Sequence, residues 1–393
     1  GCCTNFLDLC RRTGIASALR RDRTLWFVGP DGRRAACTPA RWLPAPLHLA
    51  PLLLGMRHFS LGEKAALARG MLRLARAGAA PEGATARDWL TAAGQPERVI
   101  RLFWQPVLES ALGESIDLVS VAAARKVAVD GFLAHRAAAD LLVPTEPLGT
   151  LFGARLVGWL RERGVAIRTA AAATGIDRHA GRVVAVRCGE ETVPCAAAIV
   201  AVPWRQAARI VPDVVPAADE RLTGSPITAV HLWFDRNVVD LPHAVLVGRV
   251  SQWVFRAEDA SPGHCQVVIS ASRGLLDGDR DRLRETVVAE LREIFPRARG
   301  ATLLDARIVT DPTAVLSVRP GVEAVRPGPR TTVDNLFLAG DWTATGWPST
   351  MEGAVRSGRR AAEEAAAALG RPVRAIVADL PRNPLVRLLA GRH

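Results

Sequence analysis

The chain has 393 residues, of which 49% are hydrophobic and 23% charged, a composition typical of folded globular proteins rather than disordered ones. This length is sufficient for two domains, or for one large core with a second lobe. The net charge of +12 comes mostly from arginines scattered along the chain. No basic run is interleaved with aromatics, so nucleic-acid binding is not expected. Contact of a basic face with an anionic membrane surface is left as an alternative.

The seven cysteines form no CxxC pair and are odd in number. We therefore predict neither a disulfide framework nor a metal site, and a reducing cytoplasmic location. No apolar run is long enough to cross a membrane. The nearest candidate, Arg41 to Met56, is interrupted by three prolines and a histidine.

The first part of the chain is predicted to be largely helical. Residues 4–14 form an amphipathic pattern that ends at a glycine, and residues 24–37 form a hairpin pattern around a Pro-Asp-Gly turn. From Ser60 to about residue 142 most of the pattern is helical. A capping box, Ser60 with Glu63, begins the helix that ends near residue 78.

From about residue 148 the pattern becomes α/β. A helix at 148–164 precedes short strands at 165–169 and 181–188, and the apolar run 195–204 predicts a central parallel strand buried on both faces. A second lobe follows, in which alternating patterns predict antiparallel strands and one pattern predicts an amphipathic helix. The strands are expected at 225–235, 251–258 and 265–272, and the helix at 279–296.

The α/β pattern returns at residues 335–341, "NLFLAGD", a buried strand that ends in a glycine turn. Ligands bind at this end of the strands in open α/β sheets. Ser349 and Glu352 match a capping box, so we expect a helix from Ser349 whose first-turn amides suit the anionic edge of a reduced flavin. The carboxylate of Asp341 suits ribityl hydroxyls. An ordinary strand-to-helix turn with a solvated aspartate is the alternative, and the residues alone leave both open.

The small residues Gly353, Ala354, Ser357 and Gly358 strengthen the flavin interpretation, because they allow the helix to lie close to a sheet or a flat ring. The motifs "LFLAGDW" and "PSTMEGAVRSG" resemble the C-terminal FAD signature of the flavin amine oxidase and carotenoid desaturase superfamily. Segments such as "RWLPAPLHLAPLLLG", "LFWQPVLESAL" and "SPITAVHLWFD" narrow the resemblance to the hydroxysqualene dehydroxylase family, from residue 1 to about residue 370.

The resemblance implies an α/β fold, an FAD/NAD(P)-binding Rossmann-like domain with a mixed α+β substrate lobe. It assigns 1–147 and 213–330 to the substrate lobe and 148–212 and 331–370 to the FAD domain, leaving 371–393 as a tail. Asp341 matches the acid that binds the FAD ribityl or pyrophosphate region, and Gly340 gives the close approach. The other expected FAD-binding residues are Trp342, Thr350, Met351, Ala354 and Ala173, the last through its backbone at the adenine.

One departure from the family concerns the dinucleotide motif. The family opens with a βαβ unit that carries GxGxxG, whereas this chain has 33 glycines and no GxG. At least ~30 residues of such a unit are therefore expected to be missing. A fragment of a longer reading frame is favoured over loss of the cofactor domain.

The resemblance implies reductive removal of the hydroxyl of hydroxysqualene to give squalene, with reduced FAD as the hydride donor and a polyisoprenoid lipid as substrate. A related carotenoid desaturase, an amine oxidase, or a lipid-binding protein that has lost its cofactor domain are the alternatives. No catalytic residue is named. His231 is interpreted as a sheet histidine, and His48 and His58 as packing. For residues 43–56, contact with the inner face of the cytoplasmic membrane and internal packing are weighed equally.

Overall fold

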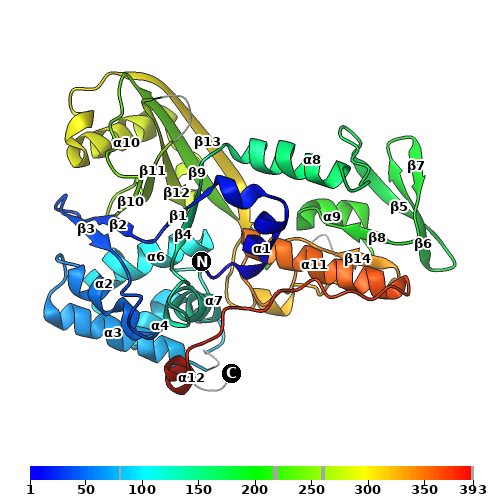
Figure 1. Cartoon of the computed structure of the whole chain (residues 1–393), viewed down its shortest axis with the longest axis horizontal. Coiled ribbons are helices and arrows are strands. Elements are labelled where there is room, and N and C mark those ends of the chain that lie inside the picture. Colours follow the sequence, from blue (N-terminus) through cyan, green and yellow to red (C-terminus); the bar gives the residue numbers. More distant parts are fainter. Residues whose placement is uncertain (79–80, 216–219, 258–261, 391–393) are drawn as a thin grey trace.

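The computed structural model describes residues 1–78, 81–215, 220–257 and 262–390. Its largest layer is a seven-stranded mixed sheet in the order β13-β9-β12-β11-β10-β2-β3 (Figure 1). All neighbours are antiparallel except β10 and β2. The strands are β2 (Leu25–Val28), β3 (Arg34–Cys37), β9 (Gly224–Phe234), β10 (His243–Leu246), β11 (Trp253–Arg256), β12 (His264–Ser270) and β13 (Leu303–Leu316). The predicted hairpin and antiparallel strands are thus confirmed, while Glu258 lies outside the described residues.

One face of the sheet is covered by α10 (Arg280–Ile294), as predicted from its amphipathic pattern. Along β9, Val230, Leu232 and Phe234 are buried in the same cluster as Leu283 and Val287 of α10. The intervening residues of β9 point to the opposite face, because successive side chains in a strand alternate. That opposite face borders the cavities described below.

Helices form the lobe beside β2 and β3. They are α2 (Ala50–Gly55), α3 (Leu61–Arg76), α4 (Ala86–Ala92), α5 (Glu97–Val99), α6 (Gln105–Leu112) and α7 (Val121–Lys126). Ser60 and Glu63 form the predicted capping box of α3, with mutual side-chain to backbone bonds of 3.2 and 2.8 Å. The apolar faces of the helices in this lobe share one core, which includes Leu74, Leu108 and the fully buried Trp104.

A second body of α/β structure lies to the right in Figure 1. It contains the parallel pair β14 (Leu336–Leu338) and β8 (Ala198–Val200), the meander β5 (Ala173–His179), β6 (Arg182–Cys188) and β7 (Glu191–Pro194), and helices α8 (Leu156–Arg161), α9 (Trp204–Ile210) and α11 (Met351–Ala368). Two expectations are wrong here. Residues 165–169 form no strand, and β8 is not buried on both faces, because Ile199 is 41% exposed. The described residues pair β8 with β14 alone, which leaves its other edge without a strand.

The remaining elements connect the two bodies. Helix α1 (Thr4–Arg12) ends two residues before Gly14 and packs on α11, and β1 (Leu19–Asp22) pairs with β4 (Leu141–Pro144). After α11 the chain runs in an extended path to α12 (Pro384–Ala390), which contacts α3. The last three residues of the predicted tail lie outside the described residues. Within the described chain, no helix combines the length and apolarity needed to cross a bilayer.

Candidate functional site

The predicted glycine turn follows β14 directly. Gly340 has φ +131°, a backbone conformation that residues with a side chain rarely adopt, and a Cβ there would lie 2.4 Å from the Trp342 indole nitrogen. The Gly340 amide donates to Ser357 Oγ of α11 at 2.8 Å. The turn therefore brings the end of β14 against the first turns of α11, as the small residues of this helix suggested.

Asp341 is half-buried, and its carboxylate accepts a hydrogen bond from Ser349 Oγ. Ser349 Oγ also accepts the Leu316 amide at 3.0 Å. Because Ser349 is engaged in this way, the predicted capping box of Ser349 with Glu352 is wrong. Thr350 caps the helix instead through Gly353 N at 3.2 Å, and α11 begins at Met351.

A buried arginine that sequence reasoning missed shapes the loop after the turn. The guanidinium of Arg326 donates to the carbonyls of Asp341 and Thr343 at 2.8 and 2.6 Å, and to Glu323 at 2.7 Å. Its side chain is wholly buried. A fork of five donors satisfies several carbonyls of one loop, which fixes the backbone on either side of Asp341.

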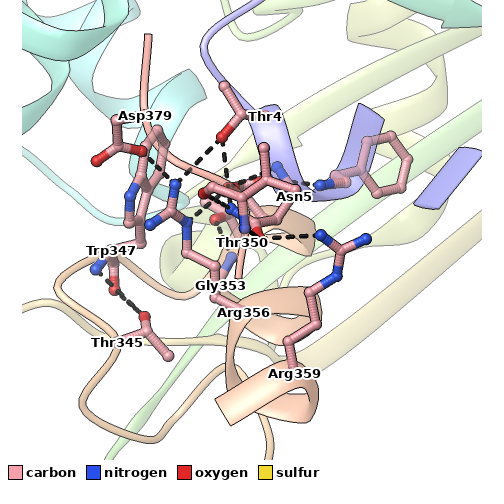
Figure 2. A network of polar contacts seen from close by, with 12 residues as sticks. Thr4, Asn5, Thr345, Trp347, Thr350, Gly353, Arg356, Arg359 and Asp379 are labelled. Carbon is pink, nitrogen blue, oxygen red and sulfur yellow. Dashed lines mark hydrogen bonds and ion pairs between the residues drawn. The ribbon is translucent and has the colours of Figure 1, made fainter. Parts of the chain in front are cut away.

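Glu352 performs a different task from the one predicted. Its carboxylate accepts the amides of Asn5 and Phe6 at 3.1 and 2.7 Å, so it caps the first turn of α1 rather than its own helix. Arg356, one turn along α11, donates to the same carboxylate at 2.6 Å. Figure 2 shows this network, in which Arg356 also reaches Asp379. The two helices α1 and α11 are thus joined by the buried Glu352 carboxylate, which accepts the α1 amides and pairs with Arg356.

The start of α11 retains the features expected of a flavin-binding helix. An 18-residue helix leaves its first amides without intrahelical partners and places the positive end of its dipole there. Met351, Ala354 and Gly358 are exposed on one side, and a Cβ on Gly358 would meet no atom within 4 Å. These residues therefore fit a flat, partly anionic ring system beside Thr350, with Asp341 placed to accept hydroxyl hydrogen bonds.

Two other predicted FAD-binding residues lie in different surroundings. Trp342 is fully buried and donates its indole N–H to the Val202 carbonyl at 2.9 Å, so its ring packs beneath the turn. Ala173 is exposed at the start of β5, opposite Cys188 of β6. The structure places Gly340 and Asp341 in the loop that leads to Thr350 and α11, and it places Ala173 and the Trp342 ring elsewhere. The roles of all these residues toward FAD stay predictions.

A cavity of about 320 Å³, here called the inner cavity, opens beside the start of α11. Thr350, Trp347 and Lys126 line its α11 side, and most of its other walls are apolar. Those other lining residues include Leu25, Phe27, Val107, Phe132, Leu141, Val245 and Trp253. A candidate flavin site therefore borders a largely apolar chamber.

Trp347 forms the wall of the inner cavity nearest Thr350, and two cations contact its ring. Lys126 Nζ lies 4.4 Å from the ring centroid, and the Arg356 guanidinium carbon lies 4.9 Å from it. Lys126 is paired with Asp130 at 2.8 Å. Neither contact is evident from the residues around Trp347, because Lys126 comes from α7 and Arg356 from the second turn of α11.

A second apolar cavity of about 220 Å³, the outer cavity, shares Leu25, Phe27, Val107 and Phe132 with the inner one. Its far side is formed by the segment from Pro46 to Met56, including Leu52 and Leu53. On the outside of the same segment Leu54 is 64% exposed, and the nearby Trp42 is 81% exposed. The segment thus separates an apolar cavity from solvent, while His48 within it is fully buried.

Other titratable groups lie near the cavities. Glu109 is buried next to Ser110 of the inner cavity, and this burial raises its pKa to about 7. The ring nitrogens His231 Nδ1 and His264 Nε2 are 3.2 Å apart. His231 lies in strand β9, so the interpretation of it as a sheet histidine is confirmed. These two histidines line a separate cavity of about 540 Å³, none of whose described lining residues belongs to the 340–351 loop. No group of three or more metal-ligating side chains occurs among the described residues.

The sequence matches the model of the flavin containing amine oxidoreductase family over residues 1–366. The chain belongs to this family. Membership confirms the predicted family and a flavin, FAD, as its cofactor.

Curated relatives narrow the resemblance. The hydroxysqualene dehydroxylases of Sinorhizobium fredii (strain NBRC 101917 / NGR234) and Rhodopseudomonas palustris (strain ATCC BAA-98 / CGA009) are each 32% identical, over 264 and 262 residues. Each alignment covers 66% of this chain and 60% of the relative. A 15-cis-phytoene desaturase of Synechococcus elongatus is 28% identical over 154 residues, or 36% of this chain and 32% of that protein. The chain thus spans less than two thirds of the dehydroxylases it matches.

Solved structures confirm the fold. Cyclohexylamine oxidase from Brevibacterium oxydans IH-35A superposes with a TM-score of 0.62 at 16% identity, covering 94% of this chain and 86% of that one. Putrescine oxidase bound to putrescine gives a TM-score of 0.63 at 14% identity with the same coverage. At such identities the likeness establishes the α/β fold predicted from the sequence and carries no statement about substrate.

Proposed function

We propose that this chain is the major part of an FAD-dependent enzyme that removes the hydroxyl of hydroxysqualene reductively, giving squalene. The observation that carries the proposal is the pair of neighbouring apolar cavities, which share lining residues and of which the inner one reaches Thr350, in a chain 32% identical to hydroxysqualene dehydroxylases. A long hydrocarbon needs such a lining, because each methylene removed from water contributes about 0.8 kcal/mol. A small polar substrate would leave these walls uncovered.

In this proposal, residues of this chain bind the flavin, orient it toward the substrate and shield the reacting carbon from water. Thr350 and Met351 would hold the pyrimidine edge of the flavin at the start of α11, and Asp341 its ribityl chain. Reduced FAD, when bound, supplies the hydride that replaces the departing hydroxide. Water is kept from the reacting carbon by the apolar walls, and the π-face of Trp253, which stacks on Phe255 with centroids 5.5 Å apart, supports positive charge that develops there.

The arrangement around Trp347 argues against an amine substrate. An ammonium group is best bound between aromatic faces that no other cation occupies. Here Lys126 and Arg356 already lie against the Trp347 ring, and the chain contains no tyrosine to complete a cage. A carotenoid desaturase shares the apolar cavity and is the nearer alternative, since a phytoene desaturase is among the relatives.

The deciding experiment mixes flavin-loaded, chemically reduced protein with hydroxysqualene in the absence of oxygen. We expect the flavin to reoxidise and squalene to appear in equal amount by gas chromatography and mass spectrometry. Reduction of oxidised flavin by phytoene, or by an amine, would instead identify the oxidative alternatives. Tight hydrocarbon binding without any flavin turnover would identify a lipid-binding protein.

We also propose that the segment of residues 43–56 contacts the membrane surface, where such a substrate resides. Leu54 within this segment and the adjacent Trp42 are exposed, Arg41 and Arg57 lie on either side of it, and other residues of the segment line the outer cavity. Apolar insertion combined with basic residues near anionic lipid is the usual requirement for one-sided attachment. This location supports entry of lipid through the outer cavity and is tested below.

A further inference from the structure

The C-terminal segment 371–390, here called the strap, lies beyond the residues matched by the family model. It leaves α11 at Gly370 and is held at successive points. The amides of Ala375 and Ile376 donate to Glu363, and Val377 exchanges two hydrogen bonds of 2.9 Å with the Asn5 side chain. The strap is therefore fixed along α1 and α11 rather than loosely attached.

The second half of the strap reaches the helical lobe. Arg382 pairs with Asp130 at 3.1 Å, and the Asn383 amide donates to the Ala134 carbonyl at 3.1 Å. Val386 of α12 is 2% exposed and belongs to a small core with Val129 and Leu133. The strap thus connects α11, which carries the candidate flavin site, to the segment that carries Lys126.

Two charged side chains of the strap connect to the same ring, Trp347. Asp379 pairs with Arg356, which lies over Trp347 as Figure 2 shows. Arg382 pairs with Asp130, which also holds Lys126 at 2.8 Å, and Lys126 contacts Trp347 from the helical lobe. The strap therefore takes part in both pairs: Asp379 shares Arg356 with Glu352 of α11, and Arg382 shares Asp130 with Lys126.

Trp347 needs such support, because its indole N–H is buried and has no hydrogen-bond partner among the described residues. The ring separates the inner cavity from a more polar pocket of about 350 Å³ lined by Asp130, Glu323 and Arg382. A ring that moved would join the apolar chamber to this polar pocket. Water would then reach the position beside Thr350.

We propose that the strap is a positioning element, in which Asp379 and Arg382 hold Arg356 and Lys126 against Trp347 and so fix the wall of the inner cavity. The proposal rests on the proposed function only for the identity of the ligand, a C30 isoprenoid. Asp379 and Arg382 touch neither the substrate nor the flavin, and act through Trp347.

The test compares Asp379→Asn and Arg382→Gln with Arg374→Gln, which removes a charge from an exposed position of the same strap. Hydrogen–deuterium exchange is followed in peptides of the 343–351 loop and of β9. We expect exchange of the loop to rise about three- to tenfold in the first two variants, a size typical of changes within a packed network, and β9 to stay protected. Unchanged exchange in the loop, or an equal rise in both regions, would overturn the proposal.

A second measurement records displacement of a fluorescent polyene by squalene. The same two variants should bind squalene about three- to tenfold more weakly, Arg374→Gln should bind normally, and Asp379→Glu should recover most of the loss. Normal squalene affinity in Asp379→Asn and Arg382→Gln would contradict a positioning role. If the unmodified chain binds no squalene, the proposed function is wrong, and the exchange experiment still decides the role of the strap.

Discussion

At the scale of single residues, the candidate site depends on side chains whose partners come from distant parts of the sequence. Asp341 was identified from its place after the glycine, and the structure adds its bond to Ser349 and the buried Arg326 that fixes its backbone. Arg326, Lys126 and Arg356 were not singled out, because basic residues scattered along the chain give no local pattern. Their importance comes from burial and from the groups they contact.

Replacing Asp341 with alanine should weaken FAD retention about tenfold to hundredfold, because a hydrogen bond to a charged group is worth about 1.5–3 kcal/mol. Flavin content after gel filtration and equilibrium titration of the flavin-loaded protein would measure the loss. Asp334→Ala is the control, since Asp334 lies just before β14 with its side chain 85% exposed. Equal flavin affinity in Asp341→Ala and in the control would show that Asp341 does not bind the flavin.

Glu109 predicts a pH dependence of stability. Burial raises the pKa of this carboxyl from 4.5 to about 7, so the folded state binds a proton that the unfolded state releases near pH 4.5. Its stabilising contribution is present below pH 4.5 and is lost as the pH rises through 7, by about 3 kcal/mol in all. Urea unfolding at pH 5 and pH 8 should show this decline, and Glu109→Gln should flatten it.

The control for this pH experiment is Glu285→Gln, at an exposed position of α10. It should leave the decline between pH 5 and pH 8 unchanged. A decline of the same size in Glu109→Gln would show that other groups cause it.

At the scale of elements, the sequence predicted helix α3 and misplaced the start of α11, although both carry a Ser-x-x-Glu motif. In α3 the side chains of Ser60 and Glu63 bond to each other's backbone amides, and Glu63 also pairs with Arg98. In the second motif, Ser349 is bonded to Asp341 and Leu316, and Glu352 to α1 and Arg356. A local motif decides the local structure only where tertiary contacts do not compete for its polar atoms.

The cap of α11 can be tested directly. Thr350→Ala should lower the free energy of unfolding by about 1 kcal/mol, because it removes the side-chain acceptor of the Gly353 amide. Thr332→Ala, at an exposed loop position, should have little effect. Chemical denaturation of both variants measures the difference, and identical stabilities would mean that Thr350 contributes nothing as the cap.

Tertiary contacts also explain why some strands were predicted wrongly from the sequence. The apolar run 195–204 suggested a strand buried on both faces, whereas β8 has three residues and exposes Ile199. Hydrophobic pattern predicts that a segment is buried, but the number and position of its neighbours depend on the whole sheet. The antiparallel strands β9, β11 and β12 were predicted well, because apolar and polar residues alternate along them as expected for strands with one buried and one less buried face.

At the scale of the whole molecule, two neighbouring cavities with shared lining residues lie between the segment of residues 43–56 and the start of α11. Leu54→Asp should reduce co-sedimentation with anionic liposomes, and high salt should reduce it further, because both apolar and electrostatic contributions are lost. Leu304→Asp is the matched control, since Leu304 is 66% exposed on β13 at the opposite edge of the sheet. Liposome binding that depends neither on lipid charge nor on Leu54→Asp would show that the segment lines the cavity and does not contact the membrane.

The central claim is that the inner cavity holds a long isoprenoid beside the flavin. Photolabelling with a squalene analogue that carries a diazirine near the middle of its chain tests this most directly, with labelled peptides identified by mass spectrometry. The account predicts labels on the peptides that contain Val107, Phe132 and Trp253, and their loss when excess squalene competes. Labels confined to surface peptides such as the one that contains Leu304, or labels that squalene does not displace, would contradict it.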